Sequence, residues 1–242
     1  DGHWFLWDRF YESTNDELDT SGMRLHVGSH REHEAHGVLH QQDSVRLKRG
    51  KFAYVTLMCE DEWLTQMRVL TYSWKRTKSP FPLIIMTLPW VKDDSVIEEL
   101  KSYGAVIKPV PYLNVPFKRA NGKSISFEKA CRYSKLHLWD LTEYDRVVYL
   151  DPLLLIVQNI DELFQYDAAF SGVKVVGDDF NTGLFVTVPS KDIYKDMLVK
   201  YPQSPPEHRG EQGFLNWFFS KHDTRVISAR YNTVIRQKVP FF

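Results

Sequence analysis

The chain has 242 residues, enough for one large α/β domain with an attached arm and a substantial buried core. Lysine plus arginine equals aspartate plus glutamate at 31 each, so nothing in the net charge indicates a nucleic-acid or membrane-surface partner. The longest apolar run, 153–157, is far shorter than the roughly 20 residues that cross a bilayer. We therefore expect no nucleic-acid partner and no membrane span. The compartment stays open between the cytoplasm and, if an upstream anchor has been removed, the Golgi lumen.

Residues 1–50 are predicted to form an arm or stem, because they are rich in histidine, acidic residues, serine and glycine and hold one dense apolar cluster, DGHWFLWDRFY. The aromatics of that cluster are expected to pin the arm onto the main domain, since so many exposed aromatics together are unusual. Five histidines between residues 26 and 40 recur at spacings of three and four, as on one face of a helix. A solvated polar helix is favoured over a metal site there, because no acidic or thiolate partner completes a zinc set.

From residue 51 the pattern alternates regularly and predicts a β-α-β-α-β order. Strands are expected at 51–57, 81–88 and 105–110, and helices at 61–75 and 93–103. The strands are near-continuous apolar runs, which suits a parallel sheet covered on both sides. The first helix carries an apolar stripe at the spacing of a core-facing surface, formed by Trp63, Met67, Leu70 and Trp74. A doubly wound, mainly parallel α/β sheet follows.

The second half has a mixed order. A basic, proline-containing stretch, 111–126, leads into a helix at 128–141 and a strand at 146–151. A helical turn, two strands and two helices are expected after it, at 159–164, 168–176, 183–189, 191–201 and from 210 onward. A parallel nucleotide-binding front followed by a strand-rich acceptor side is one common design for sugar transfer.

Cys59 and Cys131 are the two cysteines of the chain. They are too few and too far apart in sequence for a disulfide framework or a thiolate metal site. We therefore expect both to be small apolar fillers.

Ligands of open parallel sheets collect at the carboxyl ends of the strands. A dinucleotide-dependent dehydrogenase needs a glycine-rich turn after the first strand, because only glycine lets the backbone approach a pyrophosphate closely. The turn here reads MCEDEW and contains no glycine, which makes hydride transfer a poor hypothesis. The strand RVVYL, in contrast, ends in one carboxylate, Asp151, and continues into apolar residues.

Several blocks follow one another in order: AYVTLMCEDEWLTQMRVLTYSW, SKLHLWDLTEYDRVVYLD, NIDELF, FNTGLFVTVPS and GEQGFLNWFF, then YN at 231–232. Over about residues 52–232 they resemble glycosyltransferase family 8, the glycogenin-like retaining transferases. The resemblance implies a GT-A fold for residues 51–242, with a Rossmann-like nucleotide-binding half and a mixed acceptor-side half. It also implies a UDP-sugar donor, a carbohydrate or protein acceptor and, because the family often dimerises, a homodimer.

By this resemblance Leu57, Cys59 and Trp63 lie around the uridine. Trp63 offers an aromatic face for stacking on uracil, and its place in the apolar helix stripe is an equally good explanation. Lys135 corresponds to the lysine that contacts the diphosphate, with Arg132 and Lys129 within two turns of it. Charge-assisted hydrogen bonds of this type contribute roughly 1.5–3 kcal/mol each. An ordinary solvated basic face is the alternative.

The family holds a divalent cation with an Asp-x-Asp motif at the end of the central strand, and here the triplet is Asp151, Pro152, Leu153. A hydrocarbon replaces the second ligand. The family's C-terminal H-x-x-G-x-x-K-P-W segment, which supplies a histidine ligand, does not occur in the sequence. The resemblance thus implies Mn²⁺ or Mg²⁺ at Asp151 with an incomplete ligand set, although magnesium can be held by one or two carboxylates plus substrate phosphates.

Asn181 and Gly183 match the sugar-facing block of the family, and Glu211 and Gln212 match the Asp-Gln pair that faces the anomeric carbon. Glutamate in place of aspartate keeps the charge but moves it by a methylene, and a shift on the order of an ångström can cost about 100-fold in rate. Capping of the following helix is the structural alternative for Glu211.

Two functions follow from these residues. The first is a hexosyltransferase that moves a hexose from a UDP-sugar to an acceptor with retention of configuration, either weakly metal-dependent or metal-independent. The second is a catalytically inactive glycosyltransferase-fold protein that acts as a binding or scaffolding subunit. The change at Leu153 favours the second, since loss of one electrostatic contact to the departing charge costs about 100- to 1000-fold in rate.

Overall fold

The computed structural model describes residues 50–118, 122, 124–174 and 179–233. Apart from Gly50, the arm predicted at 1–50, with its histidines and aromatics, lies outside these residues. The strands are β1 (Phe52–Met58), β2 (Leu83–Thr87), β3 (Val106–Pro109), β4 (Arg146–Leu150), β5 (Phe170–Lys174), β6 (Phe180–Thr187) and β7 (Thr224–Ile227). The α-helices are α3 (Leu64–Arg76), α4 (Asp94–Ser102), α5 (Phe127–Cys131), α6 (Lys191–Lys200) and α7 (Glu211–Phe219). Short 3₁₀ helices cover Asp61–Trp63, Arg132–Asp140, Asp161–Gln165, Tyr201–Gln203, Pro206–His208 and Ala229–Tyr231.

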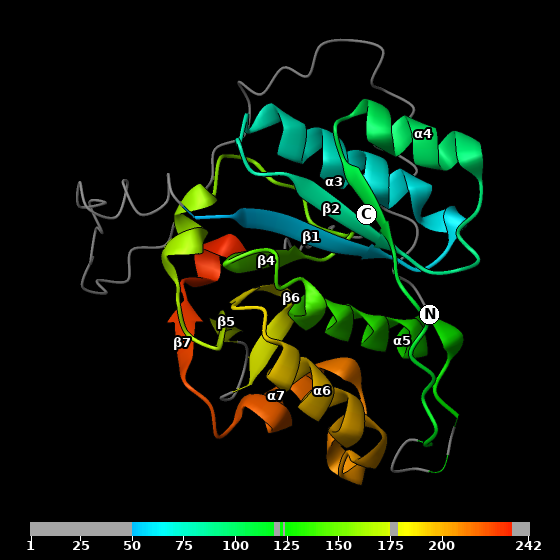
Figure 1. Ribbon diagram of the computed structural model, residues 1–242, viewed down its shortest axis with the longest axis vertical. Coiled ribbons are helices and arrows are strands. Elements are labelled where there is room, and N and C mark those ends of the chain that lie inside the picture. Colours follow the sequence, from blue (N-terminus) through cyan, green and yellow to red (C-terminus); the bar gives the residue numbers. More distant parts are fainter. Residues whose placement is uncertain (1–49, 119–121, 123, 175–178, 234–242) are drawn as a thin grey trace, which may run out of the picture. The chain divides into compact units, whose positions relative to one another are not determined.

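The strands of the described residues form one sheet in the order β3-β2-β1-β4-β6-β5-β7 (Figure 1). Neighbours from β3 to β4 are parallel, β6 runs antiparallel between β4 and β5, and β5 pairs in parallel with β7. The predicted parallel front and mixed second half are therefore confirmed. Because β1 and β4 are parallel neighbours, the residues that follow them share one edge of the sheet, where ligands of such folds bind.

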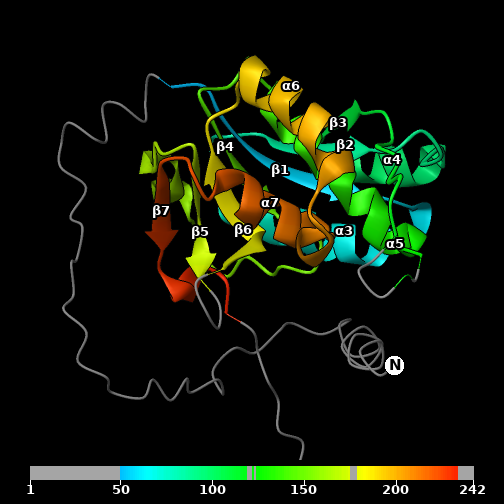
Figure 2. The ribbon, with the colours of Figure 1, turned by 90° about the horizontal axis from the view of Figure 1, so that it is seen from below.

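Helices cover both faces of the sheet, with α3 and α4 on one face and α5, α6 and α7 on the other (Figures 1 and 2). Every residue of β1 is buried, and alternate side chains enter two different cores. One core packs the α3 stripe against Phe52, Tyr54 and Met58. The other packs α6 and α7 against Ala53, Val55 and Leu57. No helix of the described residues combines the length and the apolar character that a bilayer span requires.

Capping chemistry sets the ends of two helices. The Asp93 carboxylate accepts hydrogen bonds from the backbone of Ser95 and Val96, so α4 begins at Asp94, one residue after the predicted start. Gly104, at a φ of 98°, follows its last turn in the left-handed conformation that favours glycine. The Ser190 hydroxyl caps α6 in the same way.

Three elements differ from the prediction. The helix expected at 128–141 is two pieces, because α5 ends at Cys131 and a 3₁₀ helix continues to Asp140. Residues 133–139 are all buried, so no apolar periodicity distinguishes one helix type from the other. β6 begins at Phe180, earlier than expected, and pairs with β5 across a bulge. β7 was missed, since it is a short edge strand with a single buried residue, Ile227.

Cys59 and Cys131 form a disulfide, which corrects the expectation that both are apolar fillers. Cys59 directly follows β1 and Cys131 ends α5. Their Cα atoms are 6.1 Å apart, within the range of about 4.4–6.8 Å that a bridge requires. The sequence separation of 72 was misleading, because distance along the chain does not measure distance in the fold. The bridge fixes α5 to the carboxyl end of β1.

Candidate active site

Asp151 lies at the carboxyl end of β4, beside the end of β1. Its backbone N–H donates to the Gly183 carbonyl (2.7 Å), which extends the pairing of β4 with β6 by one residue. Its Oδ1 accepts a hydrogen bond from the Leu153 N–H (3.1 Å), which orients the carboxylate over the turn that follows. Leu153 itself is 57% exposed. The strand thus presents one fixed carboxylate with an exposed hydrocarbon next to it.

Asn181 and Gly183 lie on β6, directly beside Asp151. The Asn181 Oδ1 accepts from the Gly183 N–H (2.7 Å) and from the side-chain amide of Asn232 (2.8 Å), which locks the orientation of the Asn181 amide. A Cβ atom at Gly183 would lie 2.9 Å from that Oδ1 and 3.6 Å from the Cβ of Asp151. Glycine is therefore what allows these side chains to approach one another.

Lys135 and Glu211 form a buried ion pair behind these residues. The Lys135 Nζ is 3.0 Å from the Glu211 Oε2, donates to the Thr182 carbonyl (3.0 Å) and lies 4.3 Å from the centre of the Tyr149 ring. Lys135 is 2% exposed and Glu211 is 8% exposed. In this arrangement the Lys135 ammonium is saturated by internal partners and does not reach the solvent edge of the site.

The Glu211 carboxyl occupies an unfavourable environment for a charge. Burial raises its pKa above the ordinary value, while the Lys135 ammonium and the Thr182 hydroxyl oppose that rise. Its Oε1 is buried and has no hydrogen-bond partner among the described residues. Glu211 is also the first residue of α7, so the helix-terminus interpretation and the active-site interpretation fit the same placement.

Gln212 is the exposed member of the pair on α7. Its Oε1 accepts a hydrogen bond from the Thr182 N–H (3.3 Å), and Glu211 contacts the Thr182 hydroxyl (3.1 Å). Glu211 and Gln212 therefore both contact Thr182, the residue that stands between Asn181 and Gly183 in β6. The structure brings together Asp151, Asn181, Gly183, Lys135, Glu211 and Gln212.

The residues expected around the uridine lie at the end of β1. The side chains of Leu57 and Cys59 are buried, so only their backbone is available to a ligand. The Cys59 carbonyl accepts a hydrogen bond from the Trp90 indole (2.6 Å). Trp63 is half-buried and packs against both cores, which is the helix-stripe placement. Its stacking on uracil stays a prediction.

The basic residues expected near the diphosphate lie in different environments. Arg132 is half-exposed and pairs with Glu128 (2.6 Å), and Lys129 is exposed, whereas Lys135 is buried. A pair as exposed as Arg132 and Glu128 contributes little to stability, about 0–1 kcal/mol, so Arg132 can exchange partners at low cost.

The described residues do not fit a preformed site for Mn²⁺ or Mg²⁺. No group of three or more His, Cys, Asp or Glu side chains among them is arranged to hold a metal ion. Asp151 has Leu153 where a second oxygen ligand would stand, and hard divalent cations require oxygen donors. A cation at Asp151 would depend on oxygen atoms from elsewhere, so no chemical step is assigned to it.

Sequence reasoning missed Tyr149 and Tyr133 as parts of this site. Tyr149 lies two residues before Asp151, and its ring supports the Lys135 ammonium. The Tyr133 hydroxyl accepts a hydrogen bond from the Gly210 N–H (3.0 Å), which positions the start of α7. The alternation of β4 could have indicated Tyr149, because it lies on the same face of the strand as Asp151.

Several curated proteins are similar to the chain in sequence. No protein-family model matches the chain. The chain is 31% identical over 197 residues to glycogenin-1 of Homo sapiens, covering 78% of this chain and 52% of glycogenin-1. It is 32% identical over 171 residues to inositol phosphorylceramide glucuronosyltransferase 1 of Arabidopsis thaliana, covering 70% of this chain and 30% of that protein. It is 27% identical over 214 residues to galactinol synthase 1 of Solanum lycopersicum, covering 78% of this chain and 66% of that protein.

The chain belongs to glycosyltransferase family 8. Two solved glycosyltransferases share the GT-A fold of this family 8 chain. GlyE of Streptococcus pneumoniae has a TM-score of 0.54 at 18% identity, covering 75% of this chain and 46% of GlyE. An active-site mutant of LgtC has a TM-score of 0.52 at 14% identity, covering 78% of this chain and 80% of LgtC. The predicted fold class is therefore confirmed. The family 8 chain spans between 30% and 66% of the length of the three curated relatives.

Proposed function

We propose that the chain binds a UDP-sugar at the carboxyl edge of β1 and β4 and transfers its hexose to a carbohydrate or protein acceptor with retention of configuration. One observation carries the proposal. Residues from five separate segments converge beside the end of β4: Asp151, Asn181 with Gly183, Lys135, Glu211 with Gln212, and Asn232. Membership of family 8 supports it, and one relative is named for UDP-glucuronate:xylan α-glucuronosyl transfer.

In this proposal the amide side chains bind the sugar and the basic side chains bind the diphosphate. The Gln212 amide is exposed beside Thr182, and the Asn181 amide is locked by two hydrogen bonds, so both are pre-oriented for the hydroxyl groups of a sugar. A diphosphate would compete with Glu211 for the Lys135 ammonium and with Glu128 for Arg132. In this proposal donor binding therefore includes the partial opening of the Lys135–Glu211 pair.

A second candidate function, a catalytically inactive scaffolding or binding subunit, is favoured by two observations. Leu153 exposes a hydrocarbon where the family has a carboxylate, and Lys135 is closed off by Glu211. In this case the fold is kept and the donor site is shut.

The test is UDP binding by calorimetry and hydrolysis of UDP-glucose, each with manganese and with a chelator. Saturable UDP binding that persists in chelator is the expected result. Absence of UDP binding at millimolar concentration under both conditions would defeat the proposal.

A pair of variants separates the two candidates. Leu153→Asp restores a carboxylate beside Asp151, and Leu155→Asp adds the same charge at an equally exposed leucine two residues further along. Manganese-dependent activity gained by the first variant alone means that the rest of the transfer site is intact. If neither variant gains manganese-dependent activity, the function as an inactive scaffolding or binding subunit is favoured.

A further inference from the structure

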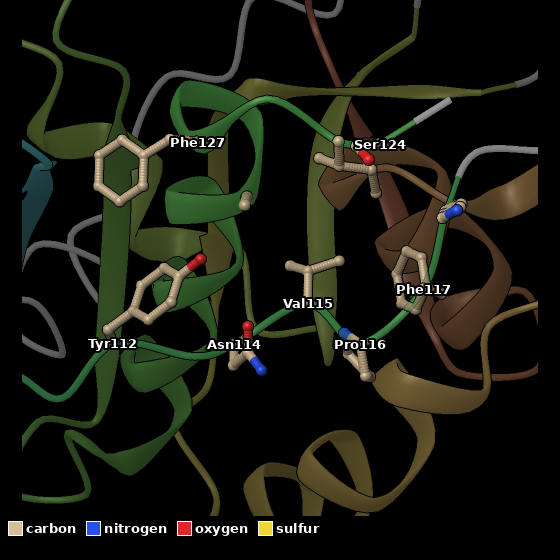
Figure 3. A pocket seen from close by; sticks show the side chains of 10 residues that line it. Tyr112, Asn114, Val115, Pro116, Phe117, Ser124 and Phe127 are labelled. Atoms are coloured by element: carbon tan, nitrogen blue, oxygen red, sulfur yellow. The ribbon is translucent and has the colours of Figure 1, made fainter. Parts of the chain in front are cut away.

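A pocket of about 420 Å³ lies between the chain that follows β3 and the beginning of α5 (Figure 3). Its volume is within the range of about 300–1,000 Å³ that small-molecule sites occupy. Seven of its ten lining residues are aromatic or aliphatic, with Tyr112 and Phe127 on one side and Pro116 and Phe117 on the other. Asn114, Lys118 and Ser124 add polar groups, and polar atoms form slightly more of the exposed lining than apolar atoms do. Aromatic and aliphatic walls combined with placed polar groups suit a ligand that has both apolar and polar surface.

An aromatic cluster extends the pocket towards the surface. The ring of Trp90 lies 5.2 Å from that of Tyr112 and 5.1 Å from that of Phe127, and the latter two are 6.0 Å apart. Trp90 is 38% exposed and Phe127 is 42% exposed. The hydrogen bond from Trp90 to the Cys59 carbonyl fixes the cluster at the end of β1. Large rings held rigidly in contact with solvent mark a binding surface.

The pocket is tied to both halves of the candidate active site. Ala130 lines it, and the next residue, Cys131, is bonded to Cys59 at the end of β1. On the opposite side the Phe117 ring meets that of Tyr133 at 5.9 Å, and Tyr133 holds the residue before Glu211. The Arg209 guanidinium, two residues before Glu211, also lies 5.2 Å from the Phe117 ring and donates to the Lys118 carbonyl (2.8 Å).

We propose that this pocket binds a sugar ring of a carbohydrate acceptor, with one face of the ring against Tyr112 and Phe127. A sugar ring has apolar C–H faces and a polar edge of hydroxyl groups, and the negative face of an aromatic ring attracts such C–H groups. Asn114 and Ser124 are placed to bond the polar edge, whereas a purely lipid ligand would leave both unpaired. The proposal rests on the proposed function, because it names the acceptor class of the same site.

The test uses two probes, an α-linked glucose tetrasaccharide and a β-linked xylose tetrasaccharide, with binding followed by calorimetry. At least one probe is expected to bind the unchanged chain saturably. Phe127→Ala should weaken that binding about 10-fold, the loss of one good ring contact. Phe127→Leu keeps an apolar side chain without the ring and should weaken it as well. Tyr72→Ala removes an aromatic of comparable exposure on α3, outside the pocket, and should leave binding unchanged.

UDP binding measured on the same variants distinguishes the possible failures. An unchanged affinity for UDP in Phe127→Ala, together with weakened tetrasaccharide binding, supports the acceptor assignment. Weakened UDP binding with unchanged tetrasaccharide binding would assign the pocket to the nucleotide and overturn the proposal. If neither tetrasaccharide binds at tens of millimolar while UDP does, the acceptor pocket fails and the proposed function stands. If UDP alone fails to bind, the proposed function fails instead.

Discussion

Lys135 and Glu211 carry opposite charges in an environment that is almost closed to water, so neither can be removed alone without cost. Lys135→Met would leave the Glu211 carboxylate buried without its counter-charge, which costs about 3–5 kcal/mol in such pairs. The double variant Lys135→Met/Glu211→Gln removes both charges and is expected to regain much of that loss. The measurement is the free energy of unfolding in urea. Lys129→Met, at an exposed lysine on α5, is the control and should change it by less than about 0.5 kcal/mol.

The coupling between the two residues decides the outcome. The cycle is completed by the second single variant, Glu211→Gln. If the losses of stability in Lys135→Met and Glu211→Gln simply add in the double variant, the two side chains do not interact. A double variant that is more stable than Lys135→Met alone instead assigns the cost to the unpaired carboxylate.

For single residues, the sequence indicated which side chains gather at the carboxyl edge of β4, but it did not indicate how buried each of them is. Asp151, Asn181, Gly183, Lys135 and Glu211 could be picked out because each stands in a block with a recognisable order. The burial of Lys135 could not, since it depends on Tyr149 and Thr182, which approach from strands β4 and β6. A lysine in a helical pattern is usually exposed, and tertiary packing reversed that expectation.

Among elements, the disulfide between the end of β1 and the end of α5 gives the clearest expectation. Cys59→Ala/Cys131→Ala should lower the free energy of unfolding by roughly 4 kcal/mol, because the bridge closes a long loop in the unfolded chain. Urea unfolding with and without a dithiol reductant measures this. The reductant should lower the midpoint of the unchanged chain and leave that of the double variant where it is.

A thiol titration of the denatured chain, purified without reductant, supplies the decisive control. Two free thiols per chain would contradict the bridge. Disulfides persist in oxidising compartments and are rare in the cytosol, so of the two compartments considered the bridge favours the lumen.

Element types were predicted well for strands that are near-continuous apolar runs and for helices that carry one apolar face. The strands β1, β2 and β4 and the helices α3, α4 and α6 all carry a clear apolar pattern, and the structure has each of them. The pattern failed for a buried helical segment in which polar residues alternate with apolar ones, and for a strand that is mostly exposed. Residues 133–139 are buried on all sides and became a 3₁₀ helix, and β7, with one buried residue, was not detected.

For the whole molecule, the predicted β-α-β-α-β succession agrees with the adjacency of β1, β2 and β3, since a strand, a crossover helix and a parallel strand form one unit. The position of β6 between β4 and β5 did not follow, because antiparallel insertion is decided by contacts distant in sequence. That insertion is what brings Asn181 and Gly183 to Asp151. The mixed half of the sheet therefore completes a site that the parallel half begins.

Because β1 contributes alternate side chains to both cores, we expect the described residues to unfold in one cooperative transition. Leu138→Ala removes volume from one core and Leu70→Ala from the other, and each should cost about 2–5 kcal/mol. Both variants should lower the same urea midpoint, whether it is followed by far-ultraviolet circular dichroism or by tryptophan fluorescence, to which Trp139 in one core and Trp74 in the other contribute. Leu155→Ala, at an exposed leucine, is the control and should leave the midpoint almost unchanged. Two separated transitions in either core variant would mean that β1 does not couple the two faces of the sheet.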